Sequence, residues 1–368
     1  MNKLDLNESL TNVSSSILKK FEVEPFHTTY APLDTLLSKT KKKKISLVLF
    51  DGFGKNIIEK YKEFIPYIYT HIFKEFKSVY PPTTVAATTT LLTGKYPVET
   101  GFLGWNQYFS PINKFIDVFT NRDSVADKNI GLDVISLFLK PTYIFDLINK
   151  KAGKEIAFQV KGHLFHDLEG NFDMEAFFKE CDNVLNKAEF SYLYSPEPDH
   201  SMHEFGTSEP RILKTILKLE KYLKTMIEKH PETLFILIAD HGFVDTSSIF
   251  TKKDLELMAT LKDKEQCSSI EGRFASFNVL DKTKFLAIYN QKYKKHFHLL
   301  TKDQIISENI FGIGEPHPLF YSTLGDYFLI SKDEYMFDNS DDEIPFLKGA
   351  HAGATKEEIE LYMMVFNR

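Results

Sequence analysis

The sequence predicts an α/β protein with a doubly wound, mostly parallel central sheet and a smaller cap-like insertion. Apolar, strand-like segments alternate along the chain with amphipathic helical segments, and this alternation is typical of parallel sheets. Neither an internal repeat nor a low-complexity linker interrupts it. The length of 368 residues exceeds the usual size of one hydrophobic core only modestly. We therefore expect a single elaborated domain over residues 1–368.

Three strand-like apolar runs each lead to an aspartate. The runs and their aspartates are residues 45–50 with Asp51, residues 190–194 with Asp199, and residues 234–239 with Asp240. In an open α/β sheet, ligands bind in the crevice at the carboxyl ends of the strands, so we expect the three carboxylates to converge there. A fourth strand is expected at residues 155–160, after a helix at residues 143–148.

Other helices are expected between these strands. Residues 56–77 carry apolar side chains at near-helical spacing that Pro66 interrupts, which predicts one kinked helix or two. Residues 207–210 supply a cap and an early proline for a long amphipathic helix that reaches about His230.

Residues 251–345 have a different character, with short strand-like pieces, two glycines close together and several prolines. This stretch separates Asp240 and His241 from His351. We therefore expect it to form a cap-like insertion, with the catalytic core at about residues 40–250 and 346–368.

Composition excludes some classes of partner. Charged residues make up 26% of the chain and the net charge is -6, so we expect no long nucleic acid as a partner. The N-terminal residues 1–8 are polar, and no apolar run approaches the roughly 18 residues of a membrane-spanning helix. We therefore expect a cytoplasmic protein without membrane insertion, and the oligomeric state stays open.

Carboxylates and imidazoles provide a candidate metal centre. The candidate ligands are Asp51, Asp199, His203, Asp240, His241 and His351. Gathered in one crevice, these groups would repel and desolvate one another unless cations held them, and zinc accepts this mixture of oxygen and nitrogen ligands. Each histidine alone would more often be a packed or exposed residue, but the combined set favours metal binding.

A threonine-rich turn at residues 79–94 is the candidate nucleophile segment. Its prolines favour an extended approach, and the following residues can start a helix whose first amides face an anion. A threonine hydroxyl bound to a metal ion could attack phosphorus or sulfur. Without the ligand set, the segment would be interpreted as a helix cap with β-branched packing.

These landmarks together resemble the alkaline phosphatase superfamily, and within it the type I phosphodiesterase and nucleotide pyrophosphatase branch. The matching segments follow the order found in the family and span most of the chain: residues 49–52, 80–94, 197–206, 239–242 and 349–353. Each segment alone is of modest specificity, but their joint specificity is high. The resemblance implies an alkaline-phosphatase-like fold.

The resemblance also implies two divalent metal ions, usually zinc. It assigns Asp51, Thr84, Asp240 and His241 to one ion and Asp199, His203 and His351 to the other. In the family the nucleophile, here Thr84, forms a covalent phospho-enzyme that water then hydrolyses. Thr83 is the rival nucleophile, because only the alignment favours Thr84.

The resemblance places Asn106 near an asparagine that holds a phosphoryl oxygen in phosphodiesterases, where phosphomonoesterases use an arginine. The alternative interpretation of Asn106 is a turn residue. Val85 replaces an aromatic residue that stacks on the base in nucleotide-cleaving relatives, and Ala87 replaces a common asparagine, so nucleotide preference stays open.

Two further groups bear on the substrate. Trp105 and Phe205 are candidates for an aromatic wall of the substrate pocket. Arg273 could reach a phosphate from the cap, but a surface salt bridge is its expected role.

The sequence therefore predicts a two-metal phosphodiesterase or pyrophosphatase that hydrolyses a small phosphodiester through a phosphothreonine intermediate. A phosphomonoesterase, phosphonate hydrolase or phosphomutase on the same scaffold is the first alternative. A catalytically inactive, metal-bound regulatory protein is the second.

Overall fold

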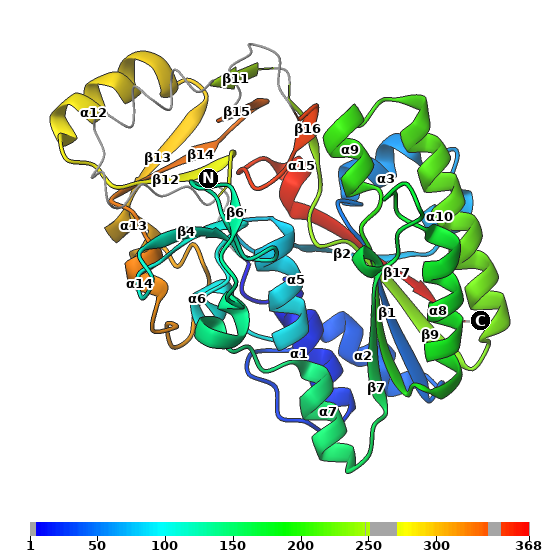
Figure 1. The fold of residues 1–368 in the computed structure, drawn as a ribbon. Helices are drawn as coiled ribbons and strands as arrows, with labels where there is room; N and C mark the ends of the chain where they lie inside the picture. Colours follow the sequence, from blue (N-terminus) through cyan, green and yellow to red (C-terminus); the bar gives the residue numbers. More distant parts are fainter. Residues whose placement is uncertain (1–4, 247, 251–270, 338–346, 368) are drawn as a thin grey trace.

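The fold is built around a six-stranded sheet. The structure is a computed structural model that describes residues 5–246, 248–250, 271–337 and 347–367 (Figure 1). The strand order is β2-β17-β9-β1-β8-β7. The bounds of these strands are β1 (Lys44–Phe50), β2 (Ile72–Lys77), β7 (Ala157–Lys161), β8 (Phe190–Ser195), β9 (Thr233–Ile238) and β17 (Glu360–Phe366). Strands β7, β8, β1 and β9 are parallel, and only β17 runs against its neighbours, which confirms the predicted mostly parallel sheet.

The centre of the sheet is apolar on both faces. All residues of β9 are buried, as are those of β1 after Lys44. Such continuous burial is typical of parallel strands that helices cover on both sides. In the register of the sheet Val48 of β1 lies opposite Leu193 of β8 and Leu237 of β9, so the carboxyl ends of the three strands lie at one edge.

Two groups of helices lie on opposite sides of this sheet (Figure 1). One group contains α1 (Leu10–Lys20), α2 (Ala31–Lys39), α5 (Thr84–Thr93) and α7 (Ile144–Ala152). The other contains α8 (Met174–Lys187) and α10 (Pro210–Lys229). Shorter helices connect the elements: α3 (Lys55–Tyr61), α4 (Pro66–Tyr69), α6 (Pro97–Thr100), η1 (Ile135–Leu139), η2 (Gly162–Leu164), α9 (Asp199–Phe205) and α15 (Lys356–Ile359). Among the helices described, none combines the length and the apolar character needed to cross a membrane.

The helical prediction for residues 56–77 is correct only in its first part. Helices α3 and α4 are separate, and Pro66 occupies the start of α4. Residues 72–77, however, form strand β2, which pairs antiparallel with β17. Pairing with a strand nearly 300 residues away in the sequence overrides the local helical spacing, as tertiary context often does.

Helix α10 begins with Pro210 at its first position, as predicted, and ends at Lys229. The predicted cap is different, because the N-cap residue Glu209 makes no side-chain capping bond. The hydroxyl and backbone N–H of Thr207 instead donate to Asp245, at 2.9 and 2.5 Å. Thr207 thus binds the loop that follows Asp240 and does not cap α10.

A second, smaller sheet lies within the expected insertion. Its order is β12-β14-β13, and its strands and neighbouring helices are β12 (Phe274–Phe277), α12 (Lys282–Ile288), η3 (Tyr289–Tyr293), β13 (Phe297–Thr301), α13 (Lys302–Ser307), α14 (Phe320–Thr323) and β14 (Tyr327–Ser331). Part of it has its own apolar cluster, which includes Phe277, Phe285 and Phe297. Both expected boundaries, at residues 251 and 345, lie outside the described residues, so the division into core and cap stays a prediction.

Three further sheets are present among the described residues. A four-stranded sheet that the sequence analysis did not anticipate contains β3 (Asn106–Phe109), β4 (Lys114–Asp117), β5 (Arg122–Asp123) and β6 (Lys128–Asn129). Strand β10 (Val244–Asp245) pairs with β16 (Gly349–Ala350), and β11 (Ser248–Phe250) pairs with β15 (Tyr335–Phe337). The β10–β16 pair brings the segment after Asp240 beside the segment before His351.

Candidate metal centre and nucleophile

Three of the predicted ligands meet at the ends of the two adjacent strands β1 and β9. Asp51 directly follows β1, and Asp240 and His241 lie just beyond β9. The backbone N–H of Gly52 donates to Asp240 Oδ1 at 3.2 Å, which ties the two strand ends together. All three side chains are buried, and each offers a ligand atom within 4.8 Å of the others. We call Asp51, Asp240 and His241 the strand-end group.

The orientation of His241 suits metal binding. Its Nδ1 lies 3.0 Å from the carbonyl oxygen of Gly242, so an N–H at Nδ1 donates to that carbonyl. The lone pair of Nε2 then faces Asp51 Oδ1 at 3.3 Å and Asp240 Oδ2 at 3.4 Å. A lone pair opposite two carboxylates is an arrangement that a cation stabilises.

The other three predicted ligands are joined through Asp199, and the second cluster of ligand atoms within 4.8 Å of one another consists of Asp199, His351 and, again, His241. Asp199 and His203 lie four residues apart on α9 and thus on one face of the helix. His203 Nε2 is 3.3 Å from Asp199 Oδ2, and His351 Nε2, from the turn after β16, is 3.7 Å from Asp199 Oδ1. Nδ1 of His203 lies 2.9 Å from the Gly349 carbonyl, which again leaves Nε2 for a ligand. We call Asp199, His203 and His351 the loop group.

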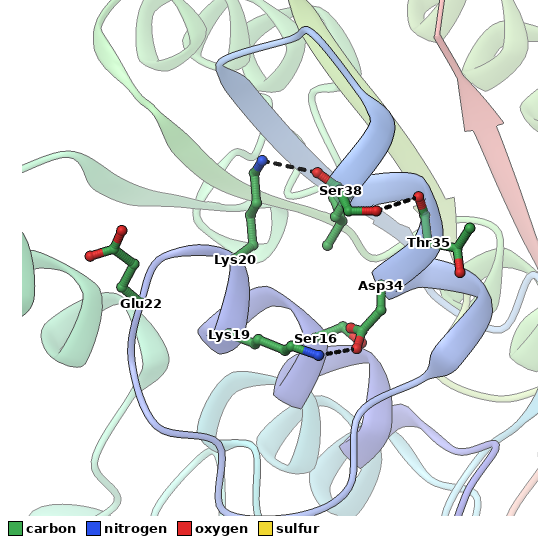
Figure 2. Close-up of a pocket in the computed structure, with 8 residues that line it drawn as sticks. Ser16, Lys19, Lys20, Glu22, Asp34, Thr35 and Ser38 are labelled. Atoms are coloured by element: carbon green, nitrogen blue, oxygen red, sulfur yellow. Dashed lines mark hydrogen bonds and ion pairs between the residues drawn. The ribbon is translucent and has the colours of Figure 1, made fainter.

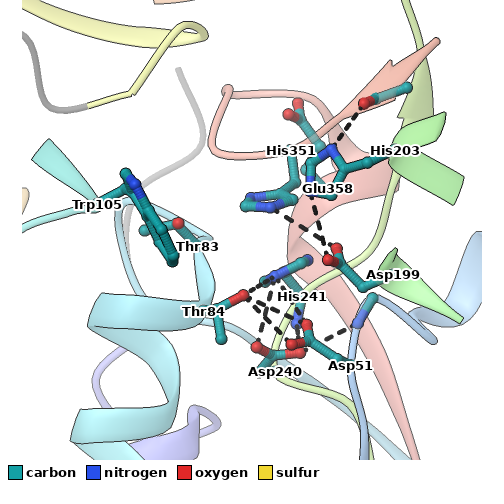
Figure 3. Close-up of polar contacts among 12 residues, drawn as sticks. Asp51, Thr83, Thr84, Trp105, Asp199, His203, Asp240, His241, His351 and Glu358 are labelled. Carbon is teal, nitrogen blue, oxygen red and sulfur yellow. Dashed lines mark hydrogen bonds and ion pairs between the residues drawn. The ribbon is translucent and has the colours of Figure 1, made fainter. Parts of the chain in front are cut away.

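The two groups adjoin each other (Figure 3). The backbone N–H of Asp199 donates to the Asp51 carbonyl at 3.1 Å. The rings of His241 and His351 stack with their centroids 3.8 Å apart. The structure therefore brings all six predicted ligands together in one centre, although their roles as ligands stay predictions.

The electrostatics of the centre reflect crowded negative charge. Burial, and next the charges of Asp240 and Asp199, raise the pKa of Asp51 well above its ordinary value. Burial and the charge of Asp199 raise the pKa of Asp240 to about 7. Burial alone would lower the pKa of His203, but the neighbouring Asp199 carboxylate raises it to about 9. Burial and then His241 lower the pKa of His351 well below its ordinary value. Without a cation, protons have to neutralise these carboxylates.

The donor set fits divalent ions. Asp199 Oδ1 and Asp240 Oδ2 are buried and have no hydrogen-bond partner within the part of the chain that the structure describes. Buried carboxylate oxygens are nearly always hydrogen-bonded or bound to a cation. A mixture of carboxylate oxygens and imidazole nitrogens is typical of zinc. The residues present therefore match a metal centre, while the number and identity of the ions stay predictions.

The two candidate nucleophiles have different partners. Thr84 Oγ1 lies 3.1 Å from His241 Nε2 and 3.3 Å from Asp51 Oδ1. Thr83, the N-cap residue of α5, donates its hydroxyl to Glu271 Oε1 at 2.6 Å. Thr84 thus faces the strand-end group from the first position of α5, where backbone N–H groups are free to bind an anion. This geometry favours Thr84 over Thr83.

The predicted substrate residues are placed less directly. The amide nitrogen of Asn106 donates to Asp117 Oδ1 at 3.0 Å, across the β3–β4 pair. The Trp105 side chain is 41% exposed and makes an edge contact with Phe119. The guanidinium of Arg211 covers one face of the Phe205 ring at 3.6 Å, which leaves less of that ring for a substrate. The roles of all three predicted residues stay predictions.

The sequence analysis missed two residues of the centre. Tyr194, in β8, donates its hydroxyl to Asp51 Oδ2, and burial followed by the charge of Asp51 raises its pKa well above the ordinary value. Its place near the end of a strand that leads to a ligand was a signal that could have identified it. Glu271 Oε1 accepts hydrogen bonds from Thr83 and from the backbone N–H of Trp105, at 2.6 and 2.7 Å. Glu271 comes from a distant segment, and no local pattern marks it.

The expectation that Arg273 forms a salt bridge is confirmed, but its expected surface position was wrong. Its side chain is fully buried rather than at the surface. Nε and Nη2 donate to the two carboxylate oxygens of Glu358, at 2.7 and 3.0 Å. Arg273 directly precedes β12 of the smaller sheet, which we call the cap sheet after the expected insertion, and Glu358 lies in α15. The charge is therefore enclosed, and Glu358 neutralises it.

A cavity of about 520 Å³ lies elsewhere, between α1 and α2 (Figure 2). Its wall includes Lys19, Lys20 and Asp34 but none of the predicted ligands. Lys19 pairs with Asp34 at 2.6 Å, and Lys20 donates to the Leu37 carbonyl at 3.0 Å. Because these cations already have partners in the wall, the cavity is not a candidate for the phosphate site.

Comparisons with known proteins bear on the family and the fold. The family model described as type I phosphodiesterase / nucleotide pyrophosphatase matches residues 46–352. The comparison with curated protein sequences found no match.

Solved structures share the fold at low sequence identity. Murine ectonucleotide pyrophosphatase / phosphodiesterase 5 is 16% identical with a TM-score of 0.61, and the match covers 87% of each chain. The human protein of the same name is 17% identical with a TM-score of 0.63, over 88% of this chain and 87% of the other. Phosphonoacetate hydrolase from Sinorhizobium meliloti 1021, in complex with phosphonoformate, is 16% identical with a TM-score of 0.62, over 88% and 90%. These likenesses show an alkaline-phosphatase-like fold.

Proposed function

We propose that this chain, which belongs to the type I phosphodiesterase / nucleotide pyrophosphatase family of the alkaline phosphatase superfamily, hydrolyses a small phosphodiester through a covalent phosphothreonine at Thr84. Family membership makes it an enzyme that acts on phosphoric ester bonds. One observation carries the finer proposal: Thr84 Oγ1 lies 3.1 Å from His241 Nε2, at a helix N-terminus beside six converging ligands.

We propose two bound zinc ions. The strand-end group together with Thr84 would hold one ion, and the loop group would hold the other. Two such ions supply electrostatic stabilisation of the attacking and the leaving oxygen in a displacement at phosphorus. The mixed oxygen and nitrogen donors support zinc.

The chain's own residues would perform two displacements. Thr84 Oγ1 attacks phosphorus while the bond to the leaving oxygen breaks on the opposite side. The hydroxyl proton of Thr84 passes to solvent, and the leaving alkoxide takes up a proton from solvent to become the alcohol. The first amides of α5 face the phosphoryl oxygens and stabilise their charge. Water then attacks phosphorus from the side that the alcohol left, the bond to Oγ1 breaks, and Thr84 recovers its proton. Two inversions give retention at phosphorus.

A phosphodiester is favoured over a phosphomonoester because the centre offers little to neutralise a second negative charge. Asn106 is neutral, and Arg273 is bound to Glu358. The carboxyl of Glu271, which lies against Thr83, supplies no positive charge beside the nucleophile. A monoester dianion would therefore be bound less well than a diester monoanion.

Phosphonate hydrolysis is the second candidate, because a phosphonoacetate hydrolase matches the fold as well as the nucleotide pyrophosphatases do. The cytoplasmic location and the absence of a long nucleic-acid partner stay predictions from the sequence.

Metal analysis combined with a substrate comparison tests the proposal. We expect close to two zinc equivalents, loss of activity with a chelator, and faster cleavage of bis-p-nitrophenyl phosphate than of p-nitrophenyl phosphate or phosphonoacetate. Faster cleavage of the monoester or the phosphonate would assign the first alternative instead. A metal-loaded protein that cleaves none of the three would support the inactive regulatory protein.

A further inference from the structure

The cap and the core are joined by a fully buried ion pair. Arg273 immediately precedes β12 of the cap sheet, and Glu358 lies in α15 of the core. Both side chains are 0% exposed, and two nearly parallel hydrogen bonds join the guanidinium to the carboxylate. The third nitrogen, Nη1, donates to the Tyr335 carbonyl at 3.0 Å, so the guanidinium is held on both sides.

The Glu358 carboxylate also holds the turn that presents His351. Its Oε1 accepts the backbone N–H of Gly353 at 2.7 Å, two residues after His351. Its Oε2 accepts the hydroxyl and the backbone N–H of Thr355, at 2.8 and 3.2 Å. Each carboxylate oxygen therefore binds Arg273 and one end of this turn at the same time.

The turn is tightly packed and locally strained. Ala352 has a φ of 85°, in the left-handed region that a residue with a Cβ rarely adopts. A Cβ at Gly353 would lie 2.7 Å from Glu358 Oε2 and 2.9 Å from Arg273 Nη2. The backbone N–H of Ala354 donates to Ser331 of the cap strand β14 at 2.9 Å. A strained conformation persists only when its surroundings hold it, and here cap and core together provide the hold.

Stability alone does not account for this arrangement. A buried ion pair contributes little net stability, because desolvation offsets the attraction, and apolar residues of similar volume often replace such pairs without loss. The pair does, however, bind the turn that carries a predicted ligand, His351. Mutation of residues that orient metal ligands without touching the ion commonly lowers metal affinity about ten- to a hundredfold.

We propose that Arg273 and Glu358 are positioning residues that couple docking of the cap to the metal affinity of the loop group. The inference rests on the proposed function, because it takes His351 as a metal ligand. Arg273 holds Glu358 in the orientation that fixes the turn at residues 351–355. When this hold is lost, His351 is no longer kept beside Asp199 and the ion of the loop group binds more weakly.

The test compares zinc retained after dialysis against graded chelator concentrations. Arg273→Lys keeps the buried positive charge but cannot form both hydrogen bonds of the guanidinium fork. We expect it to weaken one zinc equivalent about ten- to a hundredfold and to leave the other unchanged. His351→Ala should remove the same equivalent, and the combined variant should hold the remaining zinc as tightly as either single variant.

Two control variants distinguish a positioning role of Arg273 and Glu358 from a role in the folding of the protein. Asp326→Asn weakens the hydrogen bond that the Asp326 carboxylate accepts from the backbone N–H of Val279, away from the metal centre, and should leave both zinc affinities unchanged. Arg273→Met with Glu358→Gln removes both buried charges, so the metal-free fold should be retained. Glutamine has one acceptor oxygen, whereas Gly353 and Thr355 use different oxygens of Glu358, so the loop-group zinc should still bind weakly.

Three outcomes are decisive. Selective loss of one zinc equivalent in Arg273→Lys supports the proposal. Equal weakening of both equivalents, or a lower melting temperature of the metal-free protein with unchanged zinc affinities, overturns it and leaves a structural role. Wild-type protein that binds no zinc overturns the proposed function itself, so the two failures are distinguishable.

Discussion

The strand-end group and the loop group differ in how the chain holds them. Asp240 and His241 have fully buried side chains at the end of a central strand. His203, in contrast, has a side chain that is 25% exposed, on a helix of seven residues, and His351 comes from a strained turn. The register of the sheet fixes the first group, whereas the turn that carries His351 is held by hydrogen bonds to Glu358 and to Ser331 of β14. We therefore expect a rigid, tightly binding site next to a more adjustable one.

The largest expected effect concerns Thr84, the proposed nucleophile, which faces the strand-end group. Thr84→Ala should reduce turnover by at least about a thousandfold, because it removes the attacking atom while Asp51, Asp240 and His241 remain. Zinc content and melting temperature should change little. Steady-state kinetics and metal analysis of one preparation measure this.

Thr83→Ala is the matched control, because Thr83 donates to Glu271 instead of facing the ligands. Acid quenching followed by mass spectrometry should locate phosphothreonine at residue 84. A phosphoryl group on Thr83, with Thr84→Ala still active, would make Thr83 the nucleophile. The nucleophile would then not be the residue that faces the strand-end group.

The order in which the two ions are lost tests most directly whether the strand-end group binds its ion more tightly than the loop group. A chelator should remove the loop-group ion first, because that group is more exposed and its turn depends on the cap. His351→Ala should keep about one zinc equivalent and lose on the order of a hundredfold in kcat/KM, since each ion contributes several kcal/mol of stabilisation to the transition state. Simultaneous loss of both ions, in the wild type and in the variant, would mean that the centre behaves as one unit.

The sequence predicted most of the strand-end group because its signal is local. Asp51 and Asp240 each follow an uninterrupted apolar run, and parallel neighbours bring their strand ends together. His203 lies close to Asp199 in the sequence, and the two were predicted together as ligands. His351 follows no such apolar run or cluster, and the ordered set of family motifs supports it as a candidate ligand.

The missed features depend on partners far away in the sequence. Strand β2 has helical spacing but pairs with β17, and the sheet formed by β3–β6 consists of strands of two to four residues. Glu271 and Arg273 act through Thr83 and Glu358, which lie in other parts of the chain. Periodicity within a segment carries no information about such partners.

The pH dependence of the metal-free protein is the third prediction. The folded protein raises the pKa of Asp240 from 3.8 to about 7 and that of His203 from 6.5 to about 9. In both cases the folded state binds more protons than the unfolded state between the two values, so the stabilising contribution is lost as the pH rises through the folded pKa. Folding lowers the pKa of Asp199 and the pKa of His351. These two groups therefore change the stability of the protein only below about pH 6.5.

The melting temperature of the metal-free protein should therefore fall from about pH 6.5 to about pH 9. Zinc replaces the protons, so the gain in melting temperature on adding zinc should grow over the same range. Thermal denaturation at several pH values measures both. If the melting temperature of the metal-free protein rises across this range, the raised pKa values of Asp240 and His203 are contradicted.

Asn106 should have a smaller effect, because it touches neither ligand group. Asn106→Ala should slow diester cleavage by about tenfold, which corresponds to about 1.4 kcal/mol, while both zinc ions remain bound. Asn106→Asp is the informative partner, because it adds a charge next to Asp117 and should slow the reaction further. If Asn106→Ala cleaves the diester at the wild-type rate, Asn106 serves only the β3–β4 pair.

The smallest expected effect comes from Glu271, and it completes the contrast between the two sides of the centre. Glu271 contacts Thr83 on the nucleophile side, whereas Arg273, two residues later, acts on the loop group through Glu358. Glu271→Gln keeps an acceptor for Thr83 and Trp105 but removes a negative charge, which should help a dianionic monoester more than a diester. One charge at about 10 Å corresponds to about 1.7 kcal/mol at an effective dielectric constant of about 20, and solvent screening reduces this further. The ratio of monoester to diester kcat/KM should therefore rise about threefold.

Burial raises the pKa of Glu271, so this rise in the ratio should grow with pH as the wild-type carboxyl ionises. Zinc affinities should stay unchanged in Glu271→Gln, in contrast to Arg273→Lys, and a variant at residue 271 that releases zinc would show that the two sides of the centre are not separable.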